Sequence, residues 1–320
     1  MTRYDTNLLI SCGLLLMLCA TAFLWNSQHA HYMFKGFSTV VLHRHAYVAM
    51  SGMWLVAGFL IQNIYPRIAL IAKTIGFTCL TCILLLFAET CAFTTPFSLQ
   101  NHTFYHFDLF VGFHQKHVMQ FVHGHPWLND VLNTAYIQLL NVLKIAPFVL
   151  AALNDKKKVY TFFIGLIVSC IIGFTIYYFL PTTNPSSSFH SSYFMDSQYL
   201  NNFQFHAIHT HHSIDLIFAG IIGFPSFHVI WALLIAYVAW DHKWLRYPAA
   251  LLAALVLIST LSTGWHYLAD ILGGIGVTAI SIYITNRYFI RSGARELLNG
   301  RARIGVNTTP NVKRSRGLLN

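Results

Sequence analysis

Two residues near the C-terminal end of the sequence have the types and spacing of a catalytic pair. His266 and Asp270 stand four positions apart at the start of the last long apolar segment. On a helix this spacing puts two side chains on one face, one turn apart. A carboxylate so placed fixes the tautomer of the imidazole and stabilises its charged form, which makes the histidine a good nucleophile or base. Because polar groups within apolar segments are costly, we expect this pair to be functional.

A second motif combines a helix start with another histidine. Pro225 stands just ahead of an apolar run and suits the first turn of a helix, Ser226 is a candidate cap, and His228 falls in the first turn. The free N–H groups at a helix start favour bound phosphate. Two histidines, one carboxylate and this helix start therefore predict phosphoryl transfer. One histidine attacks phosphorus, Asp270 orients it, and the other histidine protonates the leaving oxygen.

The composition indicates which elements must position these groups. The chain has 320 residues, of which 56% are apolar and only 9% are charged, and its mean hydropathy is +0.54. Soluble domains carry about 25% charged residues, so this chain needs lipid around most of its perimeter. We therefore predict an all-α integral membrane protein with about eight transmembrane helices, six of them forming the catalytic bundle. The expected spans are 8–25, 47–65, 68–93, 128–153, 160–180, 227–240, 248–262 and 266–289.

The basic residues predict the orientation of these spans. The net charge is +10, but Lys and Arg gather between spans and in the tail, as the positive-inside bias requires, so nucleic acid is not the expected partner. The 182–223 loop and the 263–265 turn contain no Lys or Arg, which places them outside and both termini inside. Lys35 and Arg44 fit this topology less well. We expect a bacterial cytoplasmic membrane or an endomembrane, with the site on the periplasmic or lumenal side.

Three regions follow from these patterns. They are an N-terminal three-span region over 1–95, a catalytic membrane domain over 96–290, and a basic cytoplasmic tail over 291–320. The six cysteines are interpreted as small hydrophobic residues, since nearly all of them lie inside apolar runs.

The two motifs together resemble a known family. Pro225-Ser226-Phe227-His228, followed by Ser259-x6-His266-x3-Asp270, is similar to the pattern of the type 2 phosphatidic acid phosphatase superfamily. The resemblance implies a phosphatase-like catalytic bundle. It also implies that His266 is the nucleophile, that Asp270 orients it and that His228 is the general acid.

Departures from the family pattern are informative. Thr260 replaces the family's Arg, and the upstream Lys-x6-Arg-Pro motif is absent, because Gly173 and Leu180 stand before Pro181. In both respects the chain resembles the inositol phosphorylceramide synthase-like branch. A phosphate dianion still needs positive donors. The expected substrate-binding residues are Ser226, Lys116, Ser259 and His212, with His206, His209 and His211 as further substitutes for the missing basic residues.

The expected substrate is a lipid phosphate or phosphodiester, with water or a lipid hydroxyl as acceptor. The sequence leaves hydrolysis and transfer open, and the oligomeric state as well. The mechanism requires no metal and no other cofactor. The eighteen histidines also allow a His-rich metal transporter or haem-binding membrane protein, in which His266 and Asp270 are metal ligands. A family member without activity is a third alternative.

Overall fold

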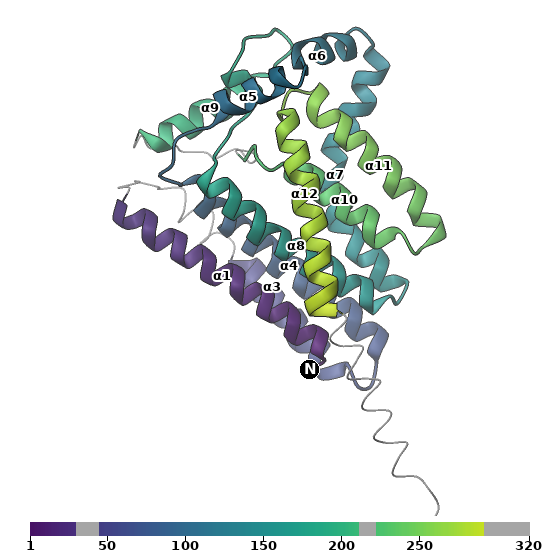
Figure 1. The fold of residues 1–320 in the computed structure, drawn as a ribbon. Coiled ribbons are helices and arrows are strands. Elements are labelled where there is room, and N and C mark those ends of the chain that lie inside the picture. The colour runs from purple at the N-terminus through teal and green to yellow at the C-terminus, as the bar shows by residue number, and fades with distance from the viewer. Residues whose placement is uncertain (30–44, 211–221, 291–320) are drawn as a thin grey trace, which may run out of the picture.

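Long apolar helices dominate the computed structural model, which describes residues 1–29, 45–210 and 222–290 (Figure 1). Within these residues the chain forms eleven α-helices, a short 3-10 helix and a π-helical turn, with no strands. Six helices are long and apolar enough to cross a membrane, and the chain is an integral membrane protein. They are α1 (Arg3–His29), α4 (Pro66–Phe93), α7 (Pro126–Ala152), α8 (Lys156–Phe179), α11 (Lys243–Ser262) and α12 (Leu268–Ile284), the last extended by η2 (Thr285–Ile290).

The predicted count of about eight spans is not confirmed. The segments expected at 47–65 and 227–240 form the shorter apolar helices α3 (His45–Ile61) and α10 (Phe227–Ala239), of 17 and 13 residues. At 1.5 Å per residue, a helix of 13 residues covers about 20 Å, less than the roughly 30 Å hydrocarbon core. Helix α10 is bounded by Ser226, which caps its start, and by Trp240, which is its C-cap.

The outer faces of the long helices are apolar. Met17 and Leu24 of α1 are 62% and 60% exposed, and Leu251 of α11 is 62% exposed. A soluble protein rarely leaves such large contiguous apolar surfaces in water. Lipid is the solvent that these faces require.

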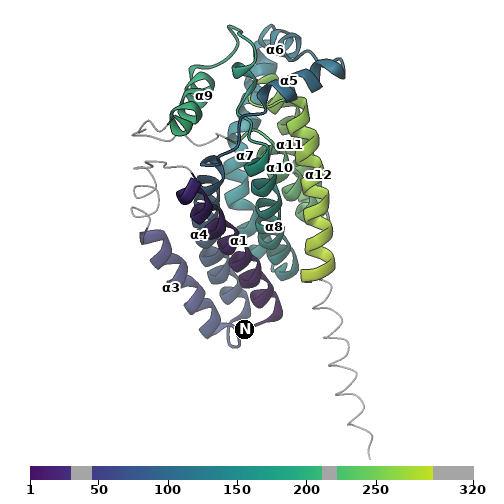
Figure 2. The same ribbon diagram turned by 60° about the vertical axis from the view of Figure 1, so that its left-hand side comes forward.

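Helix α8 lies at the centre of the bundle (Figure 2). Ile164, Ile167 and Cys170 on this helix have no exposed surface. One hydrophobic core runs from α1 and α4 through α8 to α10 and α12. Helices α1 and α4 pack on α8, which in turn packs on α10 and α12. The expected boundary near residue 95 therefore does not interrupt the core.

A buried polar cluster joins helices at the basal end of the bundle, where α1 and α8 begin and η2 ends. Lys73 Nζ lies 3.0 Å from Asp5 Oδ2 and 2.8 Å from Gln62 Oε1. The Tyr160 hydroxyl donates to Asp5 as well. Because each charge has its counter-charge and further hydrogen bonds, this cluster tolerates burial.

The opposite, apical end is covered by short helices, which are α5 (Asn101–Phe110), α6 (Gln115–His123), η1 (Pro185–Ser187) and α9 (Asp196–His209). Both ribbon views show α5, α6 and α9 at the end far from the N-terminus (Figures 1 and 2). The sequence analysis treated 182–223 as a loop, but η1 and α9 lie within this segment. Helices α10 and α12 both begin beneath this cover.

Candidate active site

Helix α10 begins as the sequence predicts, with one shift. Ser226 is the N-cap, its Oγ lies 3.5 Å from the N–H of Val229, and His228 falls in the first turn. Pro225 precedes the cap, so it is not in the first helical turn as expected. The chain just before it is held by Thr182, whose hydroxyl oxygen accepts from the N–H of Phe224 at 2.7 Å. These bonds fix the direction in which α10 leaves the apical end.

The geometry predicted for His266 and Asp270 is wrong, although their contact is correct. Helix α12 begins at Leu268, so His266 lies in the preceding turn and the two residues do not share a helix face. Asp270 is the third residue of α12, and its Oδ2 accepts the N–H of Tyr267 at 2.9 Å. The carboxylate folds back over the helix start, because the first N–H groups of a helix need acceptors.

Asp270 also contacts the imidazole of His266. Nδ1 of His266 lies 3.2 Å from Oδ2 of Asp270. Since Nδ1–H donates to the carboxylate, the lone pair of the neutral ring is on Nε2. His266 is only 4% exposed. Burial lowers the pKa of His266 to about 4, with the backbone of Gly223 opposing that shift, so the ring is neutral at physiological pH.

The second histidine lies beside the first. The ring centroids of His228 and His266 are 5.8 Å apart, and His228 is half-buried. Tyr136 of α7 stacks on His228 with its ring centroid at 4.1 Å and fixes the plane of the imidazole. The two helix starts are also joined, since the N–H of Ser226 donates to the carbonyl of Asp270 at 3.0 Å. The structure therefore brings His228, His266 and Asp270 together.

Close approach of α10 and α12 depends on Gly274. A Cβ at this position would lie 2.9 Å from the carbonyl oxygen of Ser226 and 3.0 Å from the Cβ of Val229. The turn before α12 also requires a glycine, because Gly264 has a φ of +75°. A larger residue at either position would separate the helix starts or strain the turn.

The 263–267 turn is anchored by residues that the sequence analysis did not single out. Gln115 of α6 donates through Nε2 to the carbonyls of His266 at 2.8 Å and of Leu261 at 3.1 Å. Gln198 of α9 donates to the carbonyl of Thr263 at 3.0 Å. The apical cover thus holds the backbone of His266, and no local sequence pattern indicates these long-range contacts.

Asp108 of α5 caps the start of α12. Its carboxylate accepts the N–H of Leu268 at 2.8 Å and of Ala269 at 3.2 Å. Burial raises the pKa of Asp108 to about 6, although both backbone hydrogen bonds favour the ionised form. The two sequence motifs do not include Asp108 and assign it no role.

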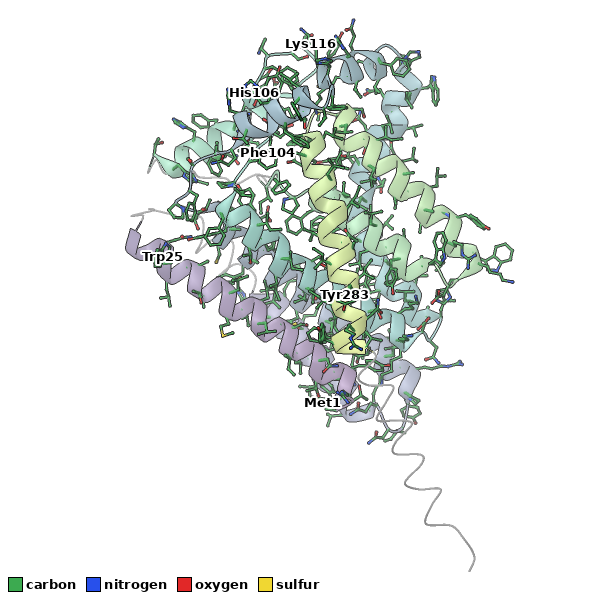
Figure 3. All side chains as sticks on the ribbon, in the orientation of Figure 1. Met1, Trp25, Phe104, His106, Lys116 and Tyr283 are labelled. Carbon is green, nitrogen blue, oxygen red and sulfur yellow. The ribbon has the colours of Figure 1, made fainter. Side chains whose placement is uncertain are left out.

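The structure places only some of the expected substrate-binding residues at the site. Ser226 lies at the site as the cap of α10. Ser259 is fully buried, and its hydroxyl donates to the carbonyl of Val256 within α11. Lys116 is exposed on α6 and points away from the bundle at the apical end (Figure 3), while its neighbour Gln115 faces the turn. His212 lies outside the residues that the structure describes, as does His211.

A cavity of about 260 Å³ opens beside the histidines. His228 lines it together with Tyr136, Trp231 and Trp265, and Glu89 of α4 contributes a carboxylate. Among the residues that the structure describes, no Lys or Arg lies in its lining. The missing basic residues of the family pattern are therefore not replaced by a described Lys or Arg in this cavity.

No cluster of three or more His, Cys, Asp or Glu residues that could hold a metal occurs in the described part of the chain. His211, His212 and Asp215 fall outside it, as part of 211–221. His206 and His209 occupy the last turn of α9. No observation favours the metal-transporter or haem-binding alternative over phosphate chemistry.

Comparison with known proteins gives one positive result. No curated protein and no solved structure matches the chain significantly. A family model described as the PAP2 superfamily matches residues 102–284, more than half of the chain. The match includes all three residues of the His228, His266 and Asp270 constellation. Such a family implies a phosphatase-type enzyme, and this chain belongs to the PAP2 superfamily.

Proposed function

We propose that the protein is a membrane-embedded lipid phosphatase or phosphotransferase that works through a phosphohistidine at His266. One observation carries this proposal. A buried histidine has its Nδ1 bound to Asp270, and a second histidine lies with its ring centroid 5.8 Å away. A nucleophile, its orienting carboxylate and a general acid are the groups that such a reaction needs.

The reaction proceeds in two balanced steps. Nε2 of His266 attacks phosphorus and the P–O bond to the leaving group breaks. His228, which takes up a proton when the anionic phosphate binds beside it, gives that proton to the leaving oxygen. Water or an alcohol then attacks the phosphohistidine and passes its proton to His228. The P–N bond breaks, and His266 returns to its neutral form. Asp270 holds the imidazole in one tautomer throughout and stabilises the positive charge on its ring.

The start of α10 is the phosphate-binding element in this mechanism. The N–H groups of Phe227 and His228 have no acceptor among the described residues. At the start of α12, by contrast, Asp108 already takes the N–H groups of Leu268 and Ala269. Since a helix start carries about half a positive charge, the open one favours a phosphate and the one occupied by a carboxylate does not.

We further propose that the apical end faces the periplasm or a lumen. Within 94–125, 180–210, 222–226 and 263–267, Lys116 is the only Lys or Arg, whereas Lys156, Lys157 and Lys158 begin α8 at the basal end. A Lys116→Cys variant in intact cells tests this, because an impermeant maleimide should label it. Labelling only after lysis would reverse the orientation.

Transfer to a lipid hydroxyl is the form of the reaction that we favour, in an inositol phosphorylceramide synthase-like branch. The supporting feature is Thr260 in place of the family's Arg, together with the absence of the upstream basic motif. Hydrolysis shares the first step, so the products distinguish the two forms.

The proposal is tested with purified protein and a panel of phospholipids and lipid phosphates. The wild type should release inorganic phosphate or form a new phospholipid, and His266→Ala should do neither. His117→Ala is a matched control, because His117 is exposed on α6 and its ring packs against that of His114. Equal turnover by His266→Ala and wild type would refute the proposed function.

A further inference from the structure

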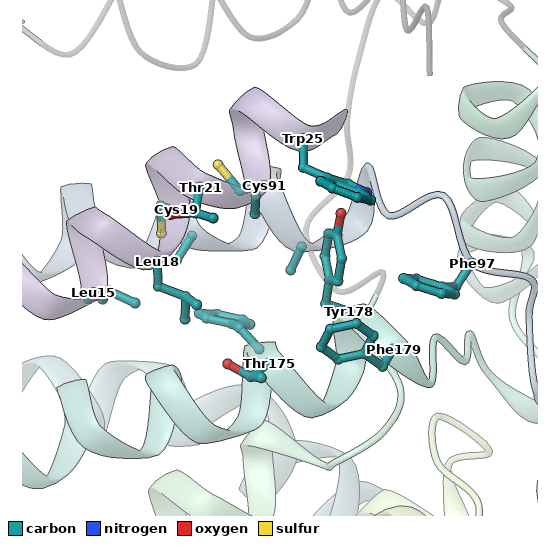
Figure 4. Close-up of a pocket in the computed structure, with 14 residues that line it drawn as sticks. Leu15, Leu18, Cys19, Thr21, Trp25, Cys91, Phe97, Thr175, Tyr178 and Phe179 are labelled. Atoms are coloured by element: carbon teal, nitrogen blue, oxygen red, sulfur yellow. The ribbon is translucent and has the colours of Figure 1, made fainter. Parts of the chain in front are cut away.

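An apolar cavity of about 380 Å³ lies between α1, α4 and α8 (Figure 4). Its lining includes Leu15, Leu18 and Ala22 from α1, Ala88 and Ala92 from α4, and the end of α8. Among the residues that the structure describes, none in this lining carries a charge. No step of phosphoryl transfer involves these residues, and their side chains suit an apolar ligand.

The two threonines in this lining require no bond from a ligand. The hydroxyl of Thr21 donates to the carbonyl of Met17 at 2.9 Å, and that of Thr175 donates to the carbonyl of Ile171 at 2.6 Å. Both hydroxyl groups are therefore paired within their own helices. An occupant of the cavity gains apolar contacts, which a hydrocarbon provides without loss of hydrogen bonds to water.

The cavity is about as deep as one leaflet of a bilayer. Along α1 its lining extends from Leu15 to Trp25, which Figure 4 shows at opposite ends. Helical rise makes this a depth of about 15 Å, half of the roughly 30 Å hydrocarbon core. Leu15 lies near the middle of α1, which spans Arg3–His29, so the cavity occupies the apical half of the bundle.

Polar groups gather at the apical edge of the cavity. The Tyr178 hydroxyl donates to the side-chain oxygen of Asn26, and Nδ2 of Asn26 donates to Oγ1 of Thr94 at 2.9 Å. With the exposed ring of Trp25, these groups are typical of the level at which a bilayer meets water. The cavity thus has a polar edge above an apolar interior, the same order as the headgroup and chain of a lipid.

Phe174 joins this cavity to the one beside His228, because its side chain lines both. The ring centroid of Phe174 is 4.6 Å from that of Phe227, the residue before the histidine. A Cβ at position 173 would lie 2.7 Å from Cζ of Phe227, so Gly173 permits this approach of α10 to α8. The apolar cavity therefore continues from the candidate active site.

The position of His228 indicates which part of a substrate faces Phe174. As the general acid, His228 must lie beside the leaving oxygen, and it lines the cavity that Phe174 also lines. The leaving group therefore lies on the Phe174 side of phosphorus. When the phosphate headgroup of a phospholipid is transferred, the leaving group is the diacylglycerol part, which carries the acyl chains.

We propose that the apolar cavity binds one acyl chain of the donor lipid, with the glycerol part near Phe174 and the chain directed toward Leu15. This inference rests on the proposed function, because it assigns the substrate class of the same site. Helices α1 and α4 precede the matched residues 102–284. They determine chain length in this account and take no part in the attack on phosphorus.

Photo-crosslinking tests the cavity without turnover. The probe is phosphatidic acid with a diazirine near the end of one hexadecanoyl chain, and the His266→Ala protein keeps it intact. The probe should label Leu15, Cys19 or Ala88, which are at most 4% exposed and which lipid around the protein does not reach. Absence of label from all three would overturn the proposal.

A matched pair of variants on α1 fills the cavity or leaves it open. Leu18 lines the cavity, whereas Leu16 is 45% exposed on the outer face of the helix and does not. Leu18→Trp should lower the labelling of the buried residues at least about fivefold, and Leu16→Trp should not. Equal labelling of the two variants would contradict the proposal. Ala22→Phe, with Ala20→Phe as control, repeats the comparison one turn along α1.

Turnover then tests whether the bound chain belongs to the substrate. Dihexanoyl and dihexadecanoyl forms of phosphatidic acid and phosphatidylglycerol are compared in mixed micelles. Leu18→Trp should lower kcat/KM for the long-chain form of a lipid that is turned over by about tenfold, the effect of roughly two methylene groups that no longer pack. The short-chain form should be nearly unaffected, because its chains end before the new ring.

The outcomes separate this inference from the proposed function. An equal change for both chain lengths in Leu18→Trp would overturn the acyl-chain assignment and leave the phosphohistidine chemistry intact. Labelling of the buried residues by the probe, with no turnover of any lipid by the wild type, would instead support the chain site and refute the proposed function.

Discussion

The two ends of the bundle each contain a buried polar cluster, and the clusters differ in how completely their groups are paired. At the basal end, Lys73 bonds to Asp5 and Gln62, and Tyr160 bonds to the same carboxylate. At the apical end, Asp270 accepts from Nδ1 of His266, but the N–H groups of Phe227 and His228 in the first turn of α10 have no acceptor among the described residues.

This difference separates a structural cluster from a chemical one. A saturated cluster gains nothing from a ligand, because every bond made to the ligand would replace an existing bond. A cluster with open donors and a free imidazole nitrogen binds an anion and reacts with it. Both ends contain buried polar groups. What distinguishes the candidate active site is that some of its hydrogen-bonding groups have no partner among the described residues.

The largest expected effect comes from removing the proposed nucleophile at the apical end. His266→Ala should lower kcat by more than about 10⁴-fold, because no other group can form the phosphorylated intermediate. The thermal midpoint of unfolding should change little, since the alanine leaves the helices in place. Steady-state kinetics and a thermal melt of the same preparation measure both. Retention of more than a hundredth of the activity would contradict the assignment.

Removing the proposed general acid should have the next largest effect. His228→Ala should lower kcat by about 10²–10⁴-fold for a lipid with an alkoxide leaving group. A substrate with a nitrophenol leaving group needs little protonation, so the loss should be much smaller with it. An equal loss for both substrates would show that His228 does not act as the acid.

A substitution in the basal cluster should lower the stability of the protein and leave its activity unchanged. Lys73→Met leaves the carboxylate of Asp5 buried without its counter-charge, so the free energy of unfolding should fall by about 3–5 kcal/mol. The specific activity of the protein that remains folded should be unchanged. Adding Asp5→Asn should restore part of the stability. A loss of kcat in the folded fraction would mean that the two ends are not functionally distinct.

Neighbouring residues on α6 give a finer comparison. Gln115→Leu removes two bonds to backbone carbonyls, including that of His266, and leaves buried acceptors unpaired. We expect kcat to fall by about tenfold through displacement of the histidine, with a smaller change in KM. Lys116→Ala is the matched control and should leave both parameters unchanged. Activity loss in the Lys116 variant alone would restore the sequence-based prediction for that residue.

The smallest expected effect is the change in kcat/KM on mild acidification. Nε2 of His266 must be neutral to attack, and burial lowers the pKa of this histidine to about 4. Protonation therefore begins to remove the nucleophile only as the pH falls toward 4, and kcat/KM should not decline between pH 7 and 5.5. An acid limb with a midpoint near pH 6.5, the ordinary value, would show that the imidazole is not buried as described.

The sequence predicted the parts of the site that depend on local patterns. Ser226 caps α10 and His228 lies in its first turn, because capping is determined by a few adjacent residues. The contact between His266 and Asp270 was also predicted, but for the wrong reason. The helix starts two residues after His266, and the carboxylate reaches back across the turn.

Tertiary packing determines the parts that the sequence did not reveal. Lys116 was chosen for its charge, yet Gln115 is the residue that the rotation of α6 directs at the turn. Tyr136 and Glu89 reach the cavity from α7 and α4, and neither stands in a motif with the histidines. The length of the expected span at 227–240 was also not predictable in detail, because apolar composition does not reveal that Ser226 caps α10 and that the helix has only 13 residues.

Isolation of the phosphorylated intermediate tests the central claim most directly. Wild-type protein is mixed with a phospholipid labelled at phosphorus, quenched under alkaline conditions within the first turnover, digested and mapped. The account predicts an acid-labile label on Nε2 of His266, which accumulates in His228→Ala if the second step slows more than the first and is absent in His266→Ala. Turnover of the lipid with the label on another residue, or with no covalent label at all, would contradict it.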